Sequence, residues 1–121
     1  MALLATEHFG LLAVGVDRFR YKDIIFHCII PNFLIQGGDI NHKYGFGGQS
    51  LCGNTFHSKH TVSLAENMLH IFFVAEFSKD DDIQCRVLTM ENATGNRTAS
   101  QFFIHLGPNL WMKGSSTVIS K

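Results

Sequence analysis

The stretch "FHCIIPNFLIQGGDI" at residues 26–40 decides the fold class. Its first part is rich in β-branched and aromatic residues, which favours strands, but Pro31 cannot donate a ladder hydrogen bond. We therefore expect two strands, over 24–30 and 33–36, on either side of this proline. A polar, flexible tetrapeptide follows and opens a glycine-dense loop over 37–53, which we expect to be exposed.

The rest of the chain also favours strands over helices. Apolar spacing predicts a short amphipathic helix over 2–12, and a polar, turn-rich loop is expected over 91–100. A buried strand is predicted over 101–107, a turn over 108–114 and a last strand over 117–120. These elements predict an all-β or β-rich domain with short helices.

Composition excludes several partners. The 121 residues suit one domain. Ten basic residues balance ten acidic ones, so no net positive charge attracts nucleic acid or an anionic membrane. The longest apolar run, at 71–75, is far shorter than the roughly 20 residues of a membrane span. Three scattered cysteines, Cys28, Cys52 and Cys85, indicate a reducing compartment, so we expect the cytoplasm, with the nucleus as the alternative.

Metal binding has a weak candidate. His57 and His60, with Cys52 nearby and Cys85 further along, could be combined into a site. A structural zinc site needs four ligands in compact, paired spacing, which this set lacks. Scattered surface histidines are the favoured interpretation, and no metal or other cofactor is expected.

Two other chemistries have little support. His27 and Cys28 are adjacent, but neighbours on a strand point to opposite faces, which disfavours a nucleophilic pair. "GFGGQS" at 45–50 lacks the Gly-Lys-Ser/Thr ending that holds a phosphate. The remaining candidates for a binding site are amide and apolar side chains, which spacing alone does not distinguish from ordinary core and loop residues. They are Phe33, Leu34, Gln36, Asn92, Gln101, Phe103, Trp111 and Met112.

The order of four segments resembles the cyclophilin family of peptidyl-prolyl cis-trans isomerases. They are "FHCIIPNFLIQGGDI", "GFGGQSLCG", "MENATGNRTASQFFI" and "LWMKG". The Phe-His-x-Ile-Ile-Pro-x-Phe-x-x-Gln-Gly-Gly-Asp pattern is highly specific. The resemblance implies a cyclophilin-like antiparallel β-barrel with a shallow groove for a substrate proline.

The resemblance also implies the site residues. Phe33, Leu34, Phe103 and Met112 would line an apolar socket for the proline ring. Gln36, Asn92 and Gln101 would hydrogen-bond the substrate backbone, with Ala93 beside them. Trp111 would edge the groove, as it does where family members bind cyclosporin. Expected partners are therefore proline-containing peptides or proteins, and cyclosporin.

Three positions depart from the family pattern. Cys28 stands where the family has its catalytic arginine, and a thiol is a weak donor without fixed charge. Ser116 replaces the common groove histidine, and Glu91 replaces a small residue. We therefore expect a weakened isomerase that assists protein folding. A non-catalytic proline-peptide-binding module and a non-functional truncated paralogue are the alternatives.

Domain organisation follows from the same comparison. The resemblance covers roughly residues 5–56 and 88–121, so we expect a single cyclophilin-like domain over 1–121, with 57–87 divergent or inserted. Compared with the family, the chain is expected to lack the first two strands and the final helix and strand.

Overall fold

The computed structural model describes most of the chain outside one long central segment. The described residues are 3–51, 56–57, 85–93, 97–112 and 116–120. They form one α-helix, one short 3-10 helix and six strands, in the order α1 Leu3–Val14, β1 Cys28–Ile30, β2 Leu34–Gly37, β3 Phe56–His57, β4 Leu88–Ala93, β5 Arg97–His105, η1 Leu110–Met112 and β6 Ser116–Ser120.

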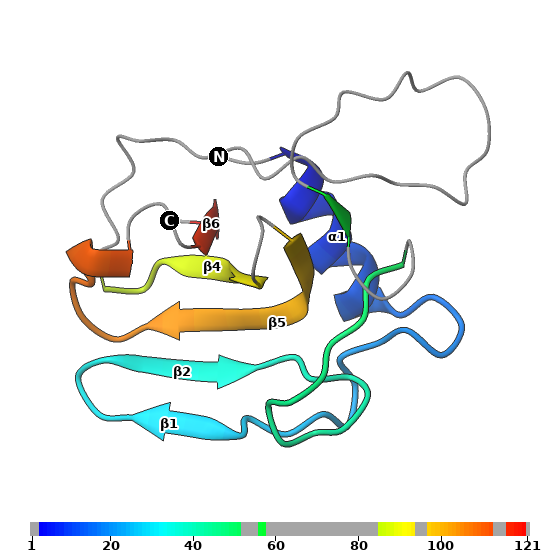
Figure 1. The fold of residues 1–121 in the computed structure, drawn as a ribbon, viewed down its shortest axis with the longest axis horizontal. Helices are drawn as coiled ribbons and strands as arrows, with labels where there is room; N and C mark the ends of the chain where they lie inside the picture. Colours follow the sequence, from blue (N-terminus) through cyan, green and yellow to red (C-terminus); the bar gives the residue numbers. More distant parts are fainter. Residues whose placement is uncertain (1–2, 52–55, 58–84, 94–96, 113–115, 121) are drawn as a thin grey trace.

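The strands form one antiparallel sheet. Its order is β1-β2-β5-β4-β6, and β3 pairs with the start of β5. Figure 1 shows β1, β2, β5 and β4 following one another across the molecule, with α1 beside the sheet. The strand-rich fold class that the sequence predicts is confirmed.

The β1–β2 hairpin turns where the proline predicted a break. Phe33 N donates to Ile30 O at 3.1 Å, with Pro31 and Asn32 between them. Asn32 has a φ of +62°, and proline followed by a residue of positive φ is typical of a type II turn. The break at Pro31 is therefore a tight reversal, and it brings Cys28 opposite Gln36.

Helix α1 covers one side of the sheet. Ala5 packs with Met90 of β4 and Ile119 of β6, and the ring of Phe9 lies 5.2 Å from that of Phe102 on β5. The helix passes through Gly10 and ends at Val14. There Gly15, at φ +96°, donates from its N to Leu11 O at 2.8 Å, which is the left-handed C-cap that glycine favours.

Three local predictions were wrong. The first strand begins at Cys28 rather than at residue 24. Residues 91–100 are not a loop, because β4 continues to Ala93 and β5 begins at Arg97. The polar residues of this stretch are accommodated at the end of a hairpin, where Asn92 pairs with Thr98. A β-bulge between Met90 and Asn92 interrupts the register there.

The third error concerns exposure of the glycine-dense loop. Gly37, Gly38, Asp39 and Ser50 are all buried, because the loop folds around the Asp39 carboxylate. Within the described part of the loop, the tip at 41–44 and Phe46 are exposed as expected.

Some predictions fall outside the described residues. Cys52, His60 and nearly all of the 57–87 segment are among them. Within the described ranges, no helix is long and apolar enough to cross a membrane.

Candidate functional site

Three predicted site residues lie side by side across the sheet. Cys28 is the Cα partner of Gln36, and Gln36 is the Cα partner of Phe103. Directly opposed residues of antiparallel strands point to the same face. Since Phe102 contacts α1, its neighbour Phe103 lies on the face away from the helix. We call this side, with Cys28, Gln36, Gln101 and Phe103, the glutamine face.

Two side-chain amides are joined on this face. Gln36 Nε2 donates to Gln101 Oε1 at 2.8 Å. Gln101 in turn donates from Nε2 to the carbonyl oxygens of Gly45, at 3.0 Å, and Gly47. Gln101 is only 5% exposed, so these bonds replace those that water would make. The two glutamines therefore connect β2 and β5 to the glycine-dense loop.

The same loop is organised from inside by Asp39. Its two carboxylate oxygens accept hydrogen bonds from the backbone N of Asn41, His42, Gly45 and Gly47, at 2.8–3.2 Å. Burial alone would raise the pKa of Asp39, but the four N–H donors lower it to about 2. Asp39 is thus a buried carboxylate that holds the loop in place.

Ser100 joins the loop to the sheet. Its hydroxyl donates to Gly38 O at 2.6 Å and accepts from Gln49 N at 3.1 Å. Its carbonyl accepts from Tyr21 Oη at 2.7 Å, on the side of the aromatic cluster that packs against α1. Gly38 has a φ of +89°, and a Cβ there would meet Ser100 O. This contact explains the glycine next to Asp39.

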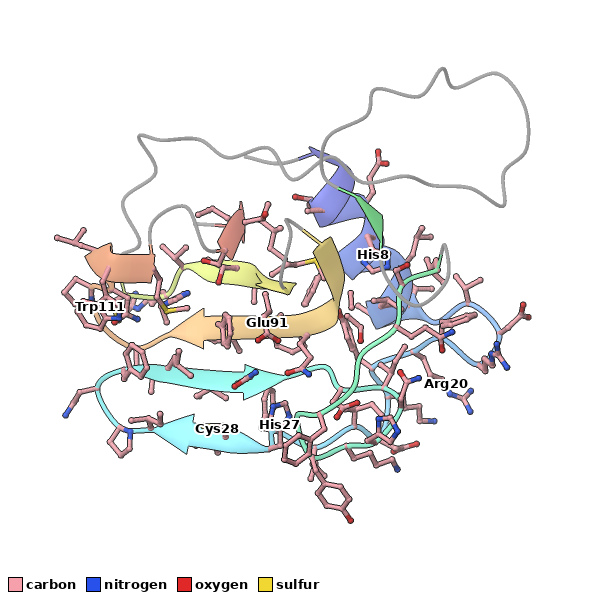
Figure 2. All side chains as sticks on the ribbon, in the orientation of Figure 1. His8, Arg20, His27, Cys28, Glu91 and Trp111 are labelled. Atoms are coloured by element: carbon pink, nitrogen blue, oxygen red, sulfur yellow. The ribbon has the colours of Figure 1, made fainter. Side chains whose placement is uncertain are left out.

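Aromatic rings gather at the other end of the hairpin. The rings of Phe33 and Trp111 are stacked at a centroid distance of 5.7 Å. Trp111 is 72% exposed, whereas Met112 packs against the buried Val87 and Val118. The turn that carries Phe33 and the η1 segment therefore meet. Figure 2 shows Trp111 at the end of the sheet remote from His8.

A buried polar chain supports this end. Thr89 Oγ1 lies 2.9 Å from His105 Nε2, and His105 Nδ1 lies 2.6 Å from Asn109 Nδ2. Asn109 also donates to Phe33 O at 3.2 Å. Burial lowers the pKa of His105, which fits its role as a neutral link. Our sequence analysis missed this chain and the role of Asp39. An Asp before a glycine-rich loop was a usable signal for the latter.

The remaining predicted residues lie around these groups. Leu34, on β2, is 4% exposed and shares its face with Gln36. Asn92 and Ala93 belong to β4, beyond the bulge, and their side chains lie outside the described part of the structure. Ser116, on β6, is 5% exposed and is the Cα partner of Glu91. Figure 2 draws Glu91 over β5.

No alternative chemistry gains support from the part of the chain that the structure describes. No three His, Cys, Asp or Glu side chains gather there as metal ligands. The ring of His27 lies against Gly45, where a Cβ would come within 2.8 Å of Nε2, and both ring nitrogens have no hydrogen-bond partner. A separate hollow contains neither acid nor thiol; its lining is Arg18, Phe19, Ile40, Asn41 and Gln49.

Comparison with known proteins decides the family. The family model described as "Cyclophilin type peptidyl-prolyl cis-trans isomerase/CLD" matches residues 4–121. The chain belongs to the cyclophilin family. A peptidyl-prolyl cis-trans isomerase D of Saccharomyces cerevisiae (strain ATCC 204508 / S288c) is 36% identical over 116 residues, which are 95% of this chain and 44% of that protein. This cyclophilin chain therefore spans less than half of the length of the curated relative that it matches.

Proposed function

We propose that the chain binds proline-containing peptides on the glutamine face and catalyses cis-trans isomerisation of their X-Pro bonds at a reduced rate. The observation that carries this proposal is the row of Cys28, Gln36 and Phe103, with Gln101 bonded to Gln36. It combines an apolar ring with amides fixed by their own hydrogen bonds. That is the chemistry needed to hold a proline and the backbone next to it.

The reaction requires neither a covalent step nor a cofactor. Rotation about the X-Pro bond must cross a barrier of roughly 20 kcal/mol that amide resonance sets. A site accelerates rotation if it binds the twisted amide more tightly than either planar form. We propose that an apolar socket takes the proline ring while amides hold the chain on one side; the socket residues are Phe33, Leu34, Phe103 and Met112, and the amides are Gln36, Asn92 and Gln101.

The weakness of the enzyme follows from Cys28. The family has an arginine at this position, and a fixed cation near the proline nitrogen favours the unconjugated lone pair of the twisted amide. Cys28 is a half-buried free thiol, which supplies neither charge nor a strong donor. Removal of one pre-organised donor costs on the order of 3 kcal/mol, or about a hundredfold in rate.

A second candidate function rests on the same residue. A chain that keeps Phe103 and the glutamines but lacks the cation could bind proline-containing segments without accelerating their isomerisation. In this case the chain is a recognition module rather than an enzyme. Both candidates share one binding face, so an experiment must measure binding and exchange separately.

The experiment uses the intrinsic fluorescence of Trp111, the only tryptophan. Because this indole stacks on Phe33, a proline bound beside Phe33 should change its emission. Titration with an Ala-Pro peptide gives a Kd, and ¹H exchange spectroscopy of the same peptide gives the isomerisation rate. Phe103→Ala should abolish both signals. Phe46→Ala is the matched control, since Phe46 is 93% exposed.

The possible results separate the candidates. Saturable binding with peptide exchange faster than in buffer supports the enzyme. Binding without faster exchange supports the recognition module. Neither binding nor exchange in a chain with a dispersed ¹H–¹⁵N spectrum would contradict both and leave the paralogue without a function of its own.

Cyclosporin and the cellular compartment complete the proposal. Trp111 at the edge of the socket supports cyclosporin binding by family resemblance, and competition with the Ala-Pro peptide tests it. We propose the cytoplasm as the location, with clients that expose X-Pro bonds during folding. Imaging of the tagged chain tests the compartment.

A further inference from the structure

Glu91 and Ser116 face the same side of the sheet. They are Cα partners in the β4–β6 pair, in unbroken register with the pairs Thr89–Val118 and Met90–Thr117. Side chains that oppose each other in this way are neighbours on one face. Thr89 is also the Cα partner of Phe103. By alternation along β4, Glu91 therefore lies on the glutamine face.

Both side chains have unused hydrogen-bonding capacity. Ser116 is 5% exposed, and its buried Oγ has no partner in the described structure. Glu91 is half-buried, and its carboxylate forms neither a hydrogen bond nor an ion pair with any described residue. Native proteins satisfy most buried polar atoms, so an unpaired serine directly opposite an unpaired carboxylate suggests a place for a donor from outside the chain.

Among the residues that the structure describes, no cation is paired with the Glu91 carboxylate. Apart from Glu91, none of the predicted site residues carries a charge, because Cys28 and Ser116 occupy the positions of the family's arginine and histidine. The nearby His105 remains neutral, since burial lowers its pKa. Burial likewise raises the pKa of Glu91. This direction is expected for a carboxylate that is poorly solvated and is not paired with a cation of the described residues.

We infer that Glu91 and Ser116 form a subsite for a lysine or arginine side chain of the substrate, beside the proline socket. An ammonium or guanidinium group has only donors, and a carboxylate and a serine oxygen can both accept from it. The preferred substrates are then X-Pro segments with a basic residue close to the proline. This inference rests on the proposed function, because it concerns the same face.

The test compares peptides that differ in one charge. Two series are used, acetyl-Ala-X-Ala-Pro-Ala-amide and acetyl-Ala-Ala-Pro-X-Ala-amide, with lysine, glutamine or glutamate at X. The Kd of each peptide is measured from Trp111 fluorescence. In at least one series we expect the lysine peptide to bind about tenfold more tightly than the glutamate peptide at low salt, and the difference to shrink at high salt.

Variants assign the preference to the two residues. Glu91→Gln should reduce the lysine preference to less than about twofold, and Ser116→Ala should weaken the lysine peptide about threefold without affecting the glutamate peptide. Glu7→Gln is the matched control, because Glu7 is exposed on α1, on the other side of the sheet. It should leave all Kd values unchanged. The ¹H–¹⁵N spectrum of each variant reports whether it is folded.

Failure of this inference can be told from failure of the proposed function. Equal Kd values for the lysine and glutamate peptides in both series would overturn the subsite and leave the proline site standing. A lysine preference that survives in Glu91→Gln would also overturn it. If Glu91→Gln does not fold, a preference that high salt leaves unchanged in the natural chain would overturn it. No binding of any peptide would overturn the proposed function and the subsite together.

Discussion

Gln36 Nε2 donates a 2.8 Å hydrogen bond to Gln101 Oε1, and this bond ties a hairpin strand to the central strand of the sheet. The amide of Gln101 then reaches the carbonyls of Gly45 and Gly47. One side chain thus connects β2, β5 and the glycine-dense loop. Two of the amides that we propose for substrate binding, those of Gln36 and Gln101, are therefore held before any substrate arrives, which is what a site needs to favour one geometry.

Gln101→Leu tests this connection. The change removes the donor to Gly45 O and Gly47 O and leaves the Gln36 amide without its acceptor. We expect the free energy of unfolding to fall by about 2 kcal/mol, because buried polar groups lose their partners. Urea denaturation measures the loss, and the amide shifts of the two glycines report release of the loop.

Gln49→Leu is the control for that substitution. Among the described residues, the side chain of Gln49 accepts one exposed hydrogen bond, from Asn41 Nδ2 at 3.3 Å. We expect its effect on stability to stay within about 0.5 kcal/mol. Equal losses of unfolding free energy in the two variants would show that the hydrogen bonds of Gln101 contribute no more to stability than the exposed bond of Gln49.

Cys28→Arg should restore isomerase activity. The arginine supplies the cation that the twisted X-Pro amide lacks, so we expect the peptide exchange rate to rise about a hundredfold. Exchange spectroscopy on an Ala-Pro peptide measures it. Cys28→Ser is the control and should change the rate by less than about threefold, because a hydroxyl also lacks fixed charge. Equal rates for the natural chain and the arginine variant would refute the role given to this position.

Stability should fall with acidity in two steps. Burial lowers the pKa of His8 from 6.5 to about 4, so the unfolded chain binds more protons between these values and stability falls as the pH drops through them. Burial also lowers the pKa of His105, in the same direction. The pKa of Asp39 is lowered from 3.8 to about 2, which places a second loss of about 2 kcal/mol between those values. Glu91, whose pKa burial raises, acts in the opposite sense.

His8→Gln separates the two steps. Glutamine can still accept from Leu51 N, the donor to His8 Nε2 at 3.3 Å, but it does not titrate. We expect thermal melting to lose much of its dependence on pH between about 6.5 and 4 while the step below pH 4 remains. Unchanged profiles above pH 4 would contradict the assignment to His8.

Two glycine substitutions should act in opposite directions. Gly38→Ala forces a side chain onto a φ of +89° and against Ser100 O, and Phe102 Cδ1 would lie 2.8 Å from the new Cβ. We expect a loss of about 2 kcal/mol or more. At Gly10, inside α1, an added Cβ meets nothing within 4 Å.

Gly10→Ala should therefore stabilise the chain by about 0.5–1 kcal/mol, because alanine is the better helix former. Melting temperatures of the two variants, measured under identical conditions, check both signs. A stabilised Gly38→Ala chain would show that the loop tolerates a different backbone conformation.

Sequence reasoning was most accurate where the signal was local. The break at Pro31 predicted two separate strands, although not that they pair as the β1–β2 hairpin, and a continuous apolar run predicted the second half of β5. It failed at 91–100, because the polar residues at the end of this hairpin pair through backbone hydrogen bonds. The polarity of their side chains does not predict such pairing. Four segments in order indicated the family, which the comparisons confirm.

The contacts of the site were less accessible to prediction. That Gln36 meets Gln101 depends on strand register across 65 residues of chain, which no local pattern encodes. Burial of Asp39 ran against the expectation for a glycine-rich segment, because the favourable partners come from the backbone rather than from other side chains. The roles of the individual residues in substrate binding remain predictions that the variants above test.

The way in which Asp39 holds its loop has a consequence for how this surface can diversify. All four of its bonds come from main-chain N–H groups, which every residue except proline possesses. The identities of the exposed side chains at 41–44 are therefore independent of the frame that supports them. Descendants of this gene could replace those residues and so change which molecules contact the loop. The hydrogen bonds to the Asp39 carboxylate would keep the loop backbone in the same conformation.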